Sequence, residues 1–128
     1  MRFHYALVTG TLVSALSVGL AASPAPAAAA SDRSACVSQV GTRTYRPSGD
    51  LGTLQVPNVY LRVGSTGACV RYAQRLIGSH GPVPGPDFVD GVFGSVTRTY
   101  VRAFQRNSGL PDDGIVGPNT WYWLMTIN

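Results

Sequence analysis

An eight-residue motif that occurs twice is the feature that most constrains the fold of this chain. DGVFGSVT begins at Asp90, and DGIVGPNT begins at Asp113, 23 positions later. In each copy an Asp-Gly pair favours a turn, two apolar residues follow, and a Gly then stands where the N-cap of a helix is expected. A Thr lies three positions beyond that Gly in both copies. Because an internal repeat indicates one local structure built twice, we expect two similar turns, each leading into a helix.

Three helices are expected around the repeat. Apolar periodicity and flanking Gly or Pro place them at about residues 65–77, 95–108 and 118–125. The positions expected to face the core are Val70, Ala73, Leu76, Ile77, Thr97, Val101, Phe104, Trp121, Leu124 and Met125. Tyr122 and Trp123 are expected on the flank of the third helix. The proline-rich segment 81–88 is predicted to be a connecting loop, because its prolines lack backbone donors.

Longer motifs surround the repeat. They are LRVGSTGACVRYAQRLI from Leu61, DGVFGSVTRTYVRAFQRNSGL from Asp90, and DGIVGPNTW, which ends at Trp121. Over about residues 58–128 this pattern resembles the small three-helix peptidoglycan-binding domain that is usually found fused to bacterial cell-wall hydrolases. The resemblance implies an all-α fold, a small three-helix bundle with two repeated DGxxG loops. It also implies non-catalytic binding of peptidoglycan or its stem peptides.

The first 30 residues have the pattern of a secretory signal peptide. Arg2 supplies a positive start, residues 5–22 are almost wholly small or apolar, and the Ala run that ends at Ala30 has the small residues that cleavage requires. A transmembrane anchor is the alternative, but Ser and Gly interrupt an apolar run that is barely long enough to span a bilayer. We therefore expect a secreted, cell-wall-associated protein that begins near Ser31 and has no membrane segment after cleavage.

The two cysteines are predicted to form one structural disulfide. Residues 31–57 are expected to be an irregular extension, with a short extended piece at 54–56, ahead of a domain at 58–128. Cys36 lies in the extension and Cys69 in the first helix, so an exported chain would link the two by a disulfide. A catalytic or redox thiol is the alternative, which the absence of CxxC spacing disfavours.

Every charged side chain is Arg or Asp, and the net charge is +4. A basic excess suits an anionic cell wall. Nucleic-acid binding would need a basic stripe interleaved with aromatics, whereas these arginines have the spacing of solvated helix faces. They are Arg71, Arg75, Arg98, Arg102 and Arg106. We expect no nucleic-acid partner, and no metal or cofactor either, because a zinc site would have to combine His80 with aspartates.

The repeated aspartates allow a catalytic and a structural interpretation. Asp90 and Asp113 could form the carboxylate pair of a glycosidase. Each lies in the same local turn, however, where Asp ordinarily accepts backbone N–H bonds, so the structural role is preferred and no enzyme is predicted. Gln74 and Gln105 come near the ends of their helices and are expected to bond to loop carbonyl and N–H groups.

A ligand site is expected where the two turns approach the end of the first helix. Backbone N–H groups of the turns would frame a shallow groove for stem-peptide carboxylates, with arginine forks and an aromatic face beside it. The expected contributors are Tyr72, Arg75, Asp90, Gly91, Arg98, Asp113, Gly114 and Trp123. Tyr60 and Tyr122 are further candidates for a stacking surface. Two other functions stay open: an exported module that binds or inhibits a protein partner such as a wall enzyme, and, less favoured, a cell-wall hydrolase.

Overall fold

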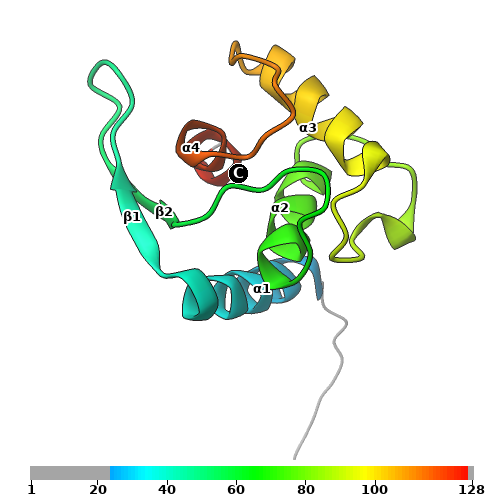
Figure 1. The fold of residues 1–128 in the computed structure, drawn as a ribbon. Helices are drawn as coiled ribbons and strands as arrows, with labels where there is room; N and C mark the ends of the chain where they lie inside the picture. Colours follow the sequence, from blue (N-terminus) through cyan, green and yellow to red (C-terminus); the bar gives the residue numbers. More distant parts are fainter. Residues whose placement is uncertain (1–23, 127–128) are drawn as a thin grey trace, which may run out of the picture.

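The computed structural model describes residues 24–126 and has a mainly helical fold, but a two-stranded sheet and a fourth helix depart from the all-α three-helix fold that the resemblance implies. Its elements, in chain order, are α1 (Pro24–Val40), β1 (Thr42–Tyr45), β2 (Leu54–Pro57), α2 (Ala68–Gly78), η1 (Pro86–Phe88), α3 (Ser95–Asn107) and α4 (Pro118–Thr126). Helices α2, α3 and α4 are the three that the sequence predicts, and Figure 1 shows them gathered in one bundle. The apolar part of the expected signal peptide, residues 5–22, lies outside the described residues.

Helix α2 begins later than the sequence predicts. The expected start was at residue 65 or 66, but the helix begins at Ala68. The preceding residues are used to pair with the first repeated turn: Gly67 N–H donates to the Gly91 carbonyl, and the Ser65 carbonyl accepts from Phe93 N–H, both at 2.9 Å. Gly67 also has a φ of 108°, a conformation that favours glycine and excludes helix.

Helix α4, the third of the predicted helices, buries more of its surface than expected. Trp121 and Leu124 are fully buried, as predicted, but Tyr122 is also buried, so its assignment to the flank is wrong. The reason is the β-hairpin. The Tyr122 hydroxyl donates to the Leu51 carbonyl at 2.8 Å, and its ring lies 5.8 Å from the ring of Tyr45.

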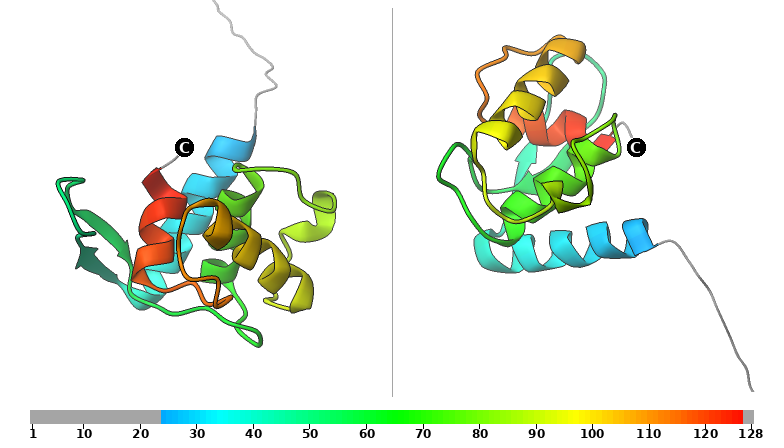
Figure 2. Two further views of the ribbon diagram at one scale, coloured as in Figure 1. Left: turned by 90° about the horizontal axis from the view of Figure 1, so that it is seen from above. Right: turned by 90° about the vertical axis from the view of Figure 1, so that its right-hand side faces the viewer.

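The predicted irregular extension, residues 31–57, is instead regular for most of its length. Helix α1 runs to Val40, and β1 and β2 pair antiparallel, from Thr42 opposite Pro57 to Tyr45 opposite Leu54. Helix α1 packs against α2, and the hairpin packs against α4. Figure 2 shows α1 running along one side of the bundle. The small residues of α1 form no apolar stripe, so periodicity gives no sign of this helix.

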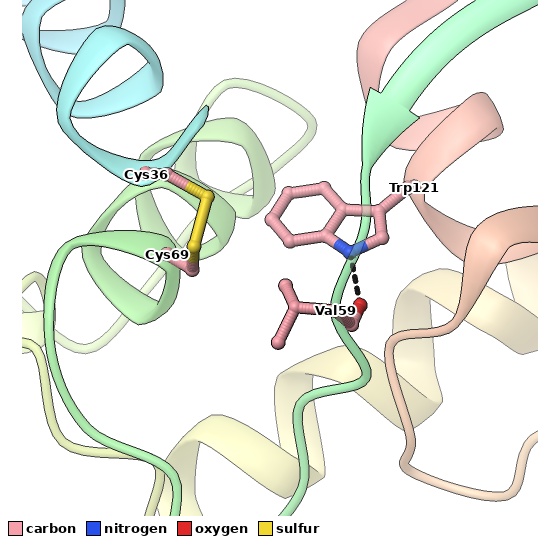
Figure 3. Close-up of a disulfide and its surroundings, with 4 residues drawn as sticks. All are labelled: Cys36, Val59, Cys69 and Trp121. Carbon is pink, nitrogen blue, oxygen red and sulfur yellow. Dashed lines mark hydrogen bonds between the residues drawn. A yellow bond between two sulfur atoms is a disulfide. The ribbon is translucent and has the colours of Figure 1, made fainter. Parts of the chain in front are cut away.

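A disulfide and an ion-pair cluster hold α1 on α2. Cys36 and Cys69 are bonded, as predicted, across a sequence separation of 33 (Figure 3). Asp32 lies 3.5 Å from Arg71 Nε and accepts a hydrogen bond from Arg75 Nε. Within residues 24–126, no helix combines the length and the apolar character needed to cross a membrane.

The core is centred on Trp121. Its indole is fully buried and stacks on Tyr72, with ring centroids 5.5 Å apart. The indole Nε1–H donates to the Val59 carbonyl at 3.0 Å, a contact drawn in Figure 3. A buried indole N–H needs such a partner, and this bond fixes α4 against the segment that follows β2.

Candidate functional site

The first repeated turn (residues 90–97) is organised by one buried amide. Gln74 of α2 is fully buried. Its Nε2 donates to the Asp90 carboxylate at 3.0 Å, to the Val92 carbonyl at 3.2 Å and to the Thr97 hydroxyl at 3.0 Å. Its Oε1 accepts from the N–H groups of Asp90 and Gly91. One side chain therefore bonds to both ends of the turn and to the helix that follows.

The second repeated turn (residues 113–120) has the same scaffold, built on Gln105 of α3. The Gln105 Nε2 donates to the Asp113 carboxylate at 3.0 Å, to the Ile115 carbonyl at 2.9 Å and to the Thr120 hydroxyl at 3.1 Å. Its Oε1 accepts from Gly114 N–H at 3.0 Å. The expected role of both glutamines, to bond to loop carbonyl and N–H groups, is confirmed.

The two aspartates accept backbone bonds inside their own turns, also as predicted. Asp90 Oδ1 accepts from Val92 N–H, and Asp113 Oδ1 accepts from Ile115 N–H, both at 2.9 Å. The Val92 N–H, with the Gln74 amide as second cause, lowers the pKa of Asp90 below its ordinary value. Asp90 is therefore ionised at neutral pH, which suits an acceptor and not a general acid.

One segment, residues 61–66, pairs with both turns. Leu61 and Val116 exchange backbone bonds at 3.0 and 2.8 Å. Further along the same segment, Gly64 N–H donates to the Phe93 carbonyl at 2.9 Å, and Thr66 bridges to Val92. The turns are thus held at two places along residues 61–66.

An open pocket of about 560 Å³ lies beside the first turn. The proline-rich loop forms one wall of the pocket, and the first turn with the start of α3 forms the other. The lining residues are Pro84, Gly85, Pro86, Asp87, Phe88, Asp90, Val92, Gly94, Ser95, Val96 and Thr97. Val92 and Val96 are 52% and 53% exposed, which is unusual for apolar side chains of this domain. Segment 81–88, predicted only as a connecting loop, is therefore also part of a pocket.

A smaller pocket of about 190 Å³ lies beside the second turn. Tyr60 lines it together with Gly117, and the two residues touch closely. A Cβ atom on Gly117 would lie 2.8 Å from Cε2 of Tyr60. The aromatic ring therefore rests directly on the backbone of the second turn.

The residues predicted to bind ligand do not converge on a single groove. Tyr72 is 4% exposed and stacked on Trp121, so its expected place on a stacking surface is wrong. Burial raises the pKa of Tyr72, against the opposing effect of Arg33. Trp123 is partly buried, with its ring edge-to-face on Tyr122 at 5.4 Å. The two pockets share no lining residue.

The predicted N–H groups and arginines also have other partners. The N–H groups of Gly91 and Gly114 are bonded to the glutamines, so neither is available to a carboxylate. Arg75 is paired with Asp32. Arg98 is exposed, and its side chain lies over the backbone of Gly114, since a Cβ there would be 2.9 Å from Arg98 Nε.

The remaining helix arginines, expected on solvated helix faces, pair with Asp112. Arg102 and Arg106 each lie 3.2 Å from Asp112. The Arg106 guanidinium first, and Arg102 second, lower the pKa of Asp112. Among the residues that the structure describes, no three His, Cys, Asp or Glu side chains lie close enough together to hold a metal ion.

Comparison with known sequences assigns the repeat-bearing part of the chain. Residues 66–124 match the family described as "Putative peptidoglycan binding domain". The match includes both turns and both glutamines that organise them. Residues 66–124 form a peptidoglycan-binding domain. The match leaves out α1 and the hairpin.

Relatives of this peptidoglycan-binding domain include larger proteins. The zinc D-Ala-D-Ala carboxypeptidase of Streptomyces albus G is 33% identical over 113 residues, which cover 86% of this chain but only 40% of that protein. A peptidoglycan-binding protein of Clostridioides difficile, solved with glutamine hydroxamate, is 33% identical with a TM-score of 0.50. That match covers 67% of this chain and 51% of the solved one.

A second solved structure contains a domain similar to this one. It is a fused zinc-dependent amidase/peptidase/peptidoglycan-binding domain-containing protein of Clostridium acetobutylicum ATCC 824. It is 28% identical, has a TM-score of 0.50, and is matched over 56% of this chain and 31% of its own. The present chain thus spans 40% of the length of the carboxypeptidase, and 51% and 31% of the lengths of the two solved proteins.

Proposed function

We propose that the protein is an exported, non-catalytic module that binds peptidoglycan, with the pocket beside the first turn as its binding site. The observation that carries this proposal is an open pocket, about 560 Å³ in volume, placed at a repeated turn of a peptidoglycan-binding domain. Ligand pockets in proteins commonly have volumes of about 300–1,000 Å³. Two exposed valines on its walls supply apolar contact area, and two aspartates supply hydrogen-bond acceptors.

The roles of the turn aspartates support binding without catalysis. Asp90 is engaged by Val92 N–H and by the Gln74 amide, and its pKa is lowered. Asp113 has the same backbone bond in a different pocket. A glycosidase needs one carboxylic acid that keeps its proton near neutral pH, facing a second carboxylate across the sugar bond. The bonds of Asp90 favour the opposite protonation state.

The contacts of α1 agree with export and cleavage near Ser31. Its side-chain bonds to α2 include those of Asp32 and Cys36, both of which a mature chain beginning at Ser31 would keep. N-terminal sequencing of the secreted protein tests this directly. A protein recovered from membranes with residues 1–22 still attached would favour the anchor instead.

A pull-down with purified insoluble cell wall, paired with a dye-release lysis assay, tests the function. We expect the protein to sediment with the wall and to release no dye. Since the net charge is +4, the pull-down is repeated at about 0.5 M salt, where surface charges are screened. Dye release would favour a hydrolase. Absence of sedimentation at both salt concentrations would favour the protein-binding alternative.

A further inference from the structure

We propose that the first-turn pocket holds one sugar ring of the glycan strand, an N-acetylated hexosamine, in the position that Tyr60 occupies at the second turn. This inference rests on the proposed function and specifies its ligand. It follows from a comparison of two pockets that the repeat makes equivalent. One of them contains a six-membered ring from the protein itself, and the other is open.

The parts of the two pockets that belong to the repeated turns are equivalent residue by residue. Every position of the second pocket that belongs to the repeated turn has a counterpart in the first at the same offset of 23 residues. The pairs are Asp90 and Asp113, Val92 and Ile115, Gly94 and Gly117, Ser95 and Pro118, Val96 and Asn119, and Thr97 and Thr120. The preceding loop extends the match, since Asp87 and Phe88 correspond to Leu110 and Pro111. The difference in volume, about 560 against about 190 Å³, therefore arises around a shared turn, from residues that line only one of the pockets: Pro84, Gly85 and Pro86 in the first, Tyr60 and Gln105 in the second.

Tyr60 is the clearest cause of the difference. A Cβ on Gly117 would meet the Tyr60 ring at 2.8 Å, whereas a Cβ on Gly94 would meet nothing within 4 Å. The segment that pairs with both turns explains why. Tyr60 precedes Leu61, which bonds to the second turn, but the residues that bond to the first turn are Gly64, Ser65 and Gly67, which carry no large side chain.

The phenol of Tyr60 indicates what chemistry fits such a pocket. It is a flat ring with a hydroxyl at its edge, resting on a glycine backbone. A pyranose ring has a similar size, an apolar C–H face and hydroxyls around its rim. At the first turn, Val92 and Val96 offer half-exposed apolar surface to such a face. Asp87 and Asp90 offer carboxylate oxygens that accept bonds from sugar hydroxyls.

The charge of the pocket favours the glycan over the stem peptide. Asp87 and Asp90 both line it, and Arg and Lys are absent from its lining. Backbone and amide donors keep Asp90 ionised. Stem peptides carry free carboxylates, which two nearby aspartates would repel, whereas a neutral N-acetylated sugar experiences no such repulsion. A stem peptide that binds through an amine is the competing outcome that the test must detect.

Placing a ring in the pocket by mutation tests its role in wall binding. Gly94 has a φ of −105°, a backbone conformation open to any residue, and space around its Cβ position. Gly94→Phe should therefore fold and fill the pocket, and we expect wall affinity to fall at least about tenfold. The matched control is Gly78→Phe, at an exposed glycine with equal space that lines neither pocket.

A second pair of variants removes the dependence on Gly94. Val96→Phe narrows the same pocket from a second position on the same wall, and Leu51→Phe places the same ring at a residue that is equally exposed, 55% against 53%, but lies outside both pockets. We expect the first to weaken wall binding and the second to leave it unchanged. Full wall binding by folded Gly94→Phe and Val96→Phe would overturn the proposal.

The ligand class is decided by titrating two soluble probes into isotope-labelled protein and following backbone amide shifts. The probes are a short neutral oligomer of N-acetylglucosamine and a free stem peptide. We expect the oligosaccharide to shift the amides of Val92 and residues 94–97, and the stem peptide to leave them unchanged. Shifts from the stem peptide alone would overturn the sugar assignment while keeping the proposed function. Failure of the wild-type protein to bind intact wall would instead remove the function itself.

Discussion

The two repeated turns have the same scaffold and different surroundings. In each, a buried glutamine donates to an aspartate, a backbone carbonyl and a threonine hydroxyl. Beside the second turn, Tyr60 rests on Gly117, whereas the equivalent Gly94 of the first turn has open space. The repeated motif therefore specifies the turn, whereas residues outside the motif decide whether a pocket beside the turn is filled or open.

The largest expected effect would come from removing the amide scaffolds. Gln74→Ala and Gln105→Ala each leave several buried donors and acceptors without partners, so we expect each to lower the free energy of unfolding by about 4 kcal/mol. Urea denaturation followed by circular dichroism measures both. Similar losses would support equal scaffolds at the two turns. A loss below about 1 kcal/mol at one turn only would show that the two glutamine scaffolds do not contribute equally to stability.

The disulfide links α1 to the helix that supports the first turn, because Cys69 lies on α2, which also carries Gln74. Replacing Cys36 and Cys69 together by Ser should lower the free energy of unfolding by about 3 kcal/mol, since the crosslink restricts the unfolded chain. Amide exchange should rise first in α1. Wall binding should persist below the melting temperature. If a still-folded double variant lost wall binding, the disulfide would have to be considered part of the site.

A smaller effect is expected from Tyr60→Ala, which would make the second pocket resemble the first. The ring is about half exposed, so its removal should lower the free energy of unfolding by about 1 kcal/mol. Wall binding through the first turn should be kept. A new set of amide shifts around residues 117–120 on adding the N-acetylglucosamine oligomer would show that the second pocket binds the sugar once the Tyr60 ring is removed. A large fall in wall binding would place the ligand on Tyr60 instead.

The smallest expected effect concerns pH. The pKa of Asp90 is lower in the folded chain than its ordinary value of 3.8, because Val92 N–H and the Gln74 amide bond to the charged form. The associated stability is therefore present above about pH 4 and is lost as the pH falls through the lowered pKa. Carboxyl carbon shifts measured over an acid titration check this. A midpoint at or above 3.8 would contradict the assigned bonds.

Sequence reasoning predicted the features that depend on residues close together in the chain. The repeat, the positions of α3 and α4, and the backbone bonds of Asp90 and Asp113 all depend on contacts within a turn or one helix. The glutamine contacts were also predicted, since each glutamine lies on the helix directly before the turn it bonds. The disulfide was predicted because the chain has only two cysteines and the sequence indicates export.

The tertiary structure alone decided the features that depend on distant segments. Helix α1 has no apolar stripe to reveal it, and its position is set by Asp32, by Cys36 and by its packing on α2. Tyr122 is buried because the hairpin reaches it across 71 positions of sequence. The difference between the two pockets also depends on distant segments. The motif determines a turn through local hydrogen bonds, but whether an aromatic ring covers that turn depends on which distant segment packs against it.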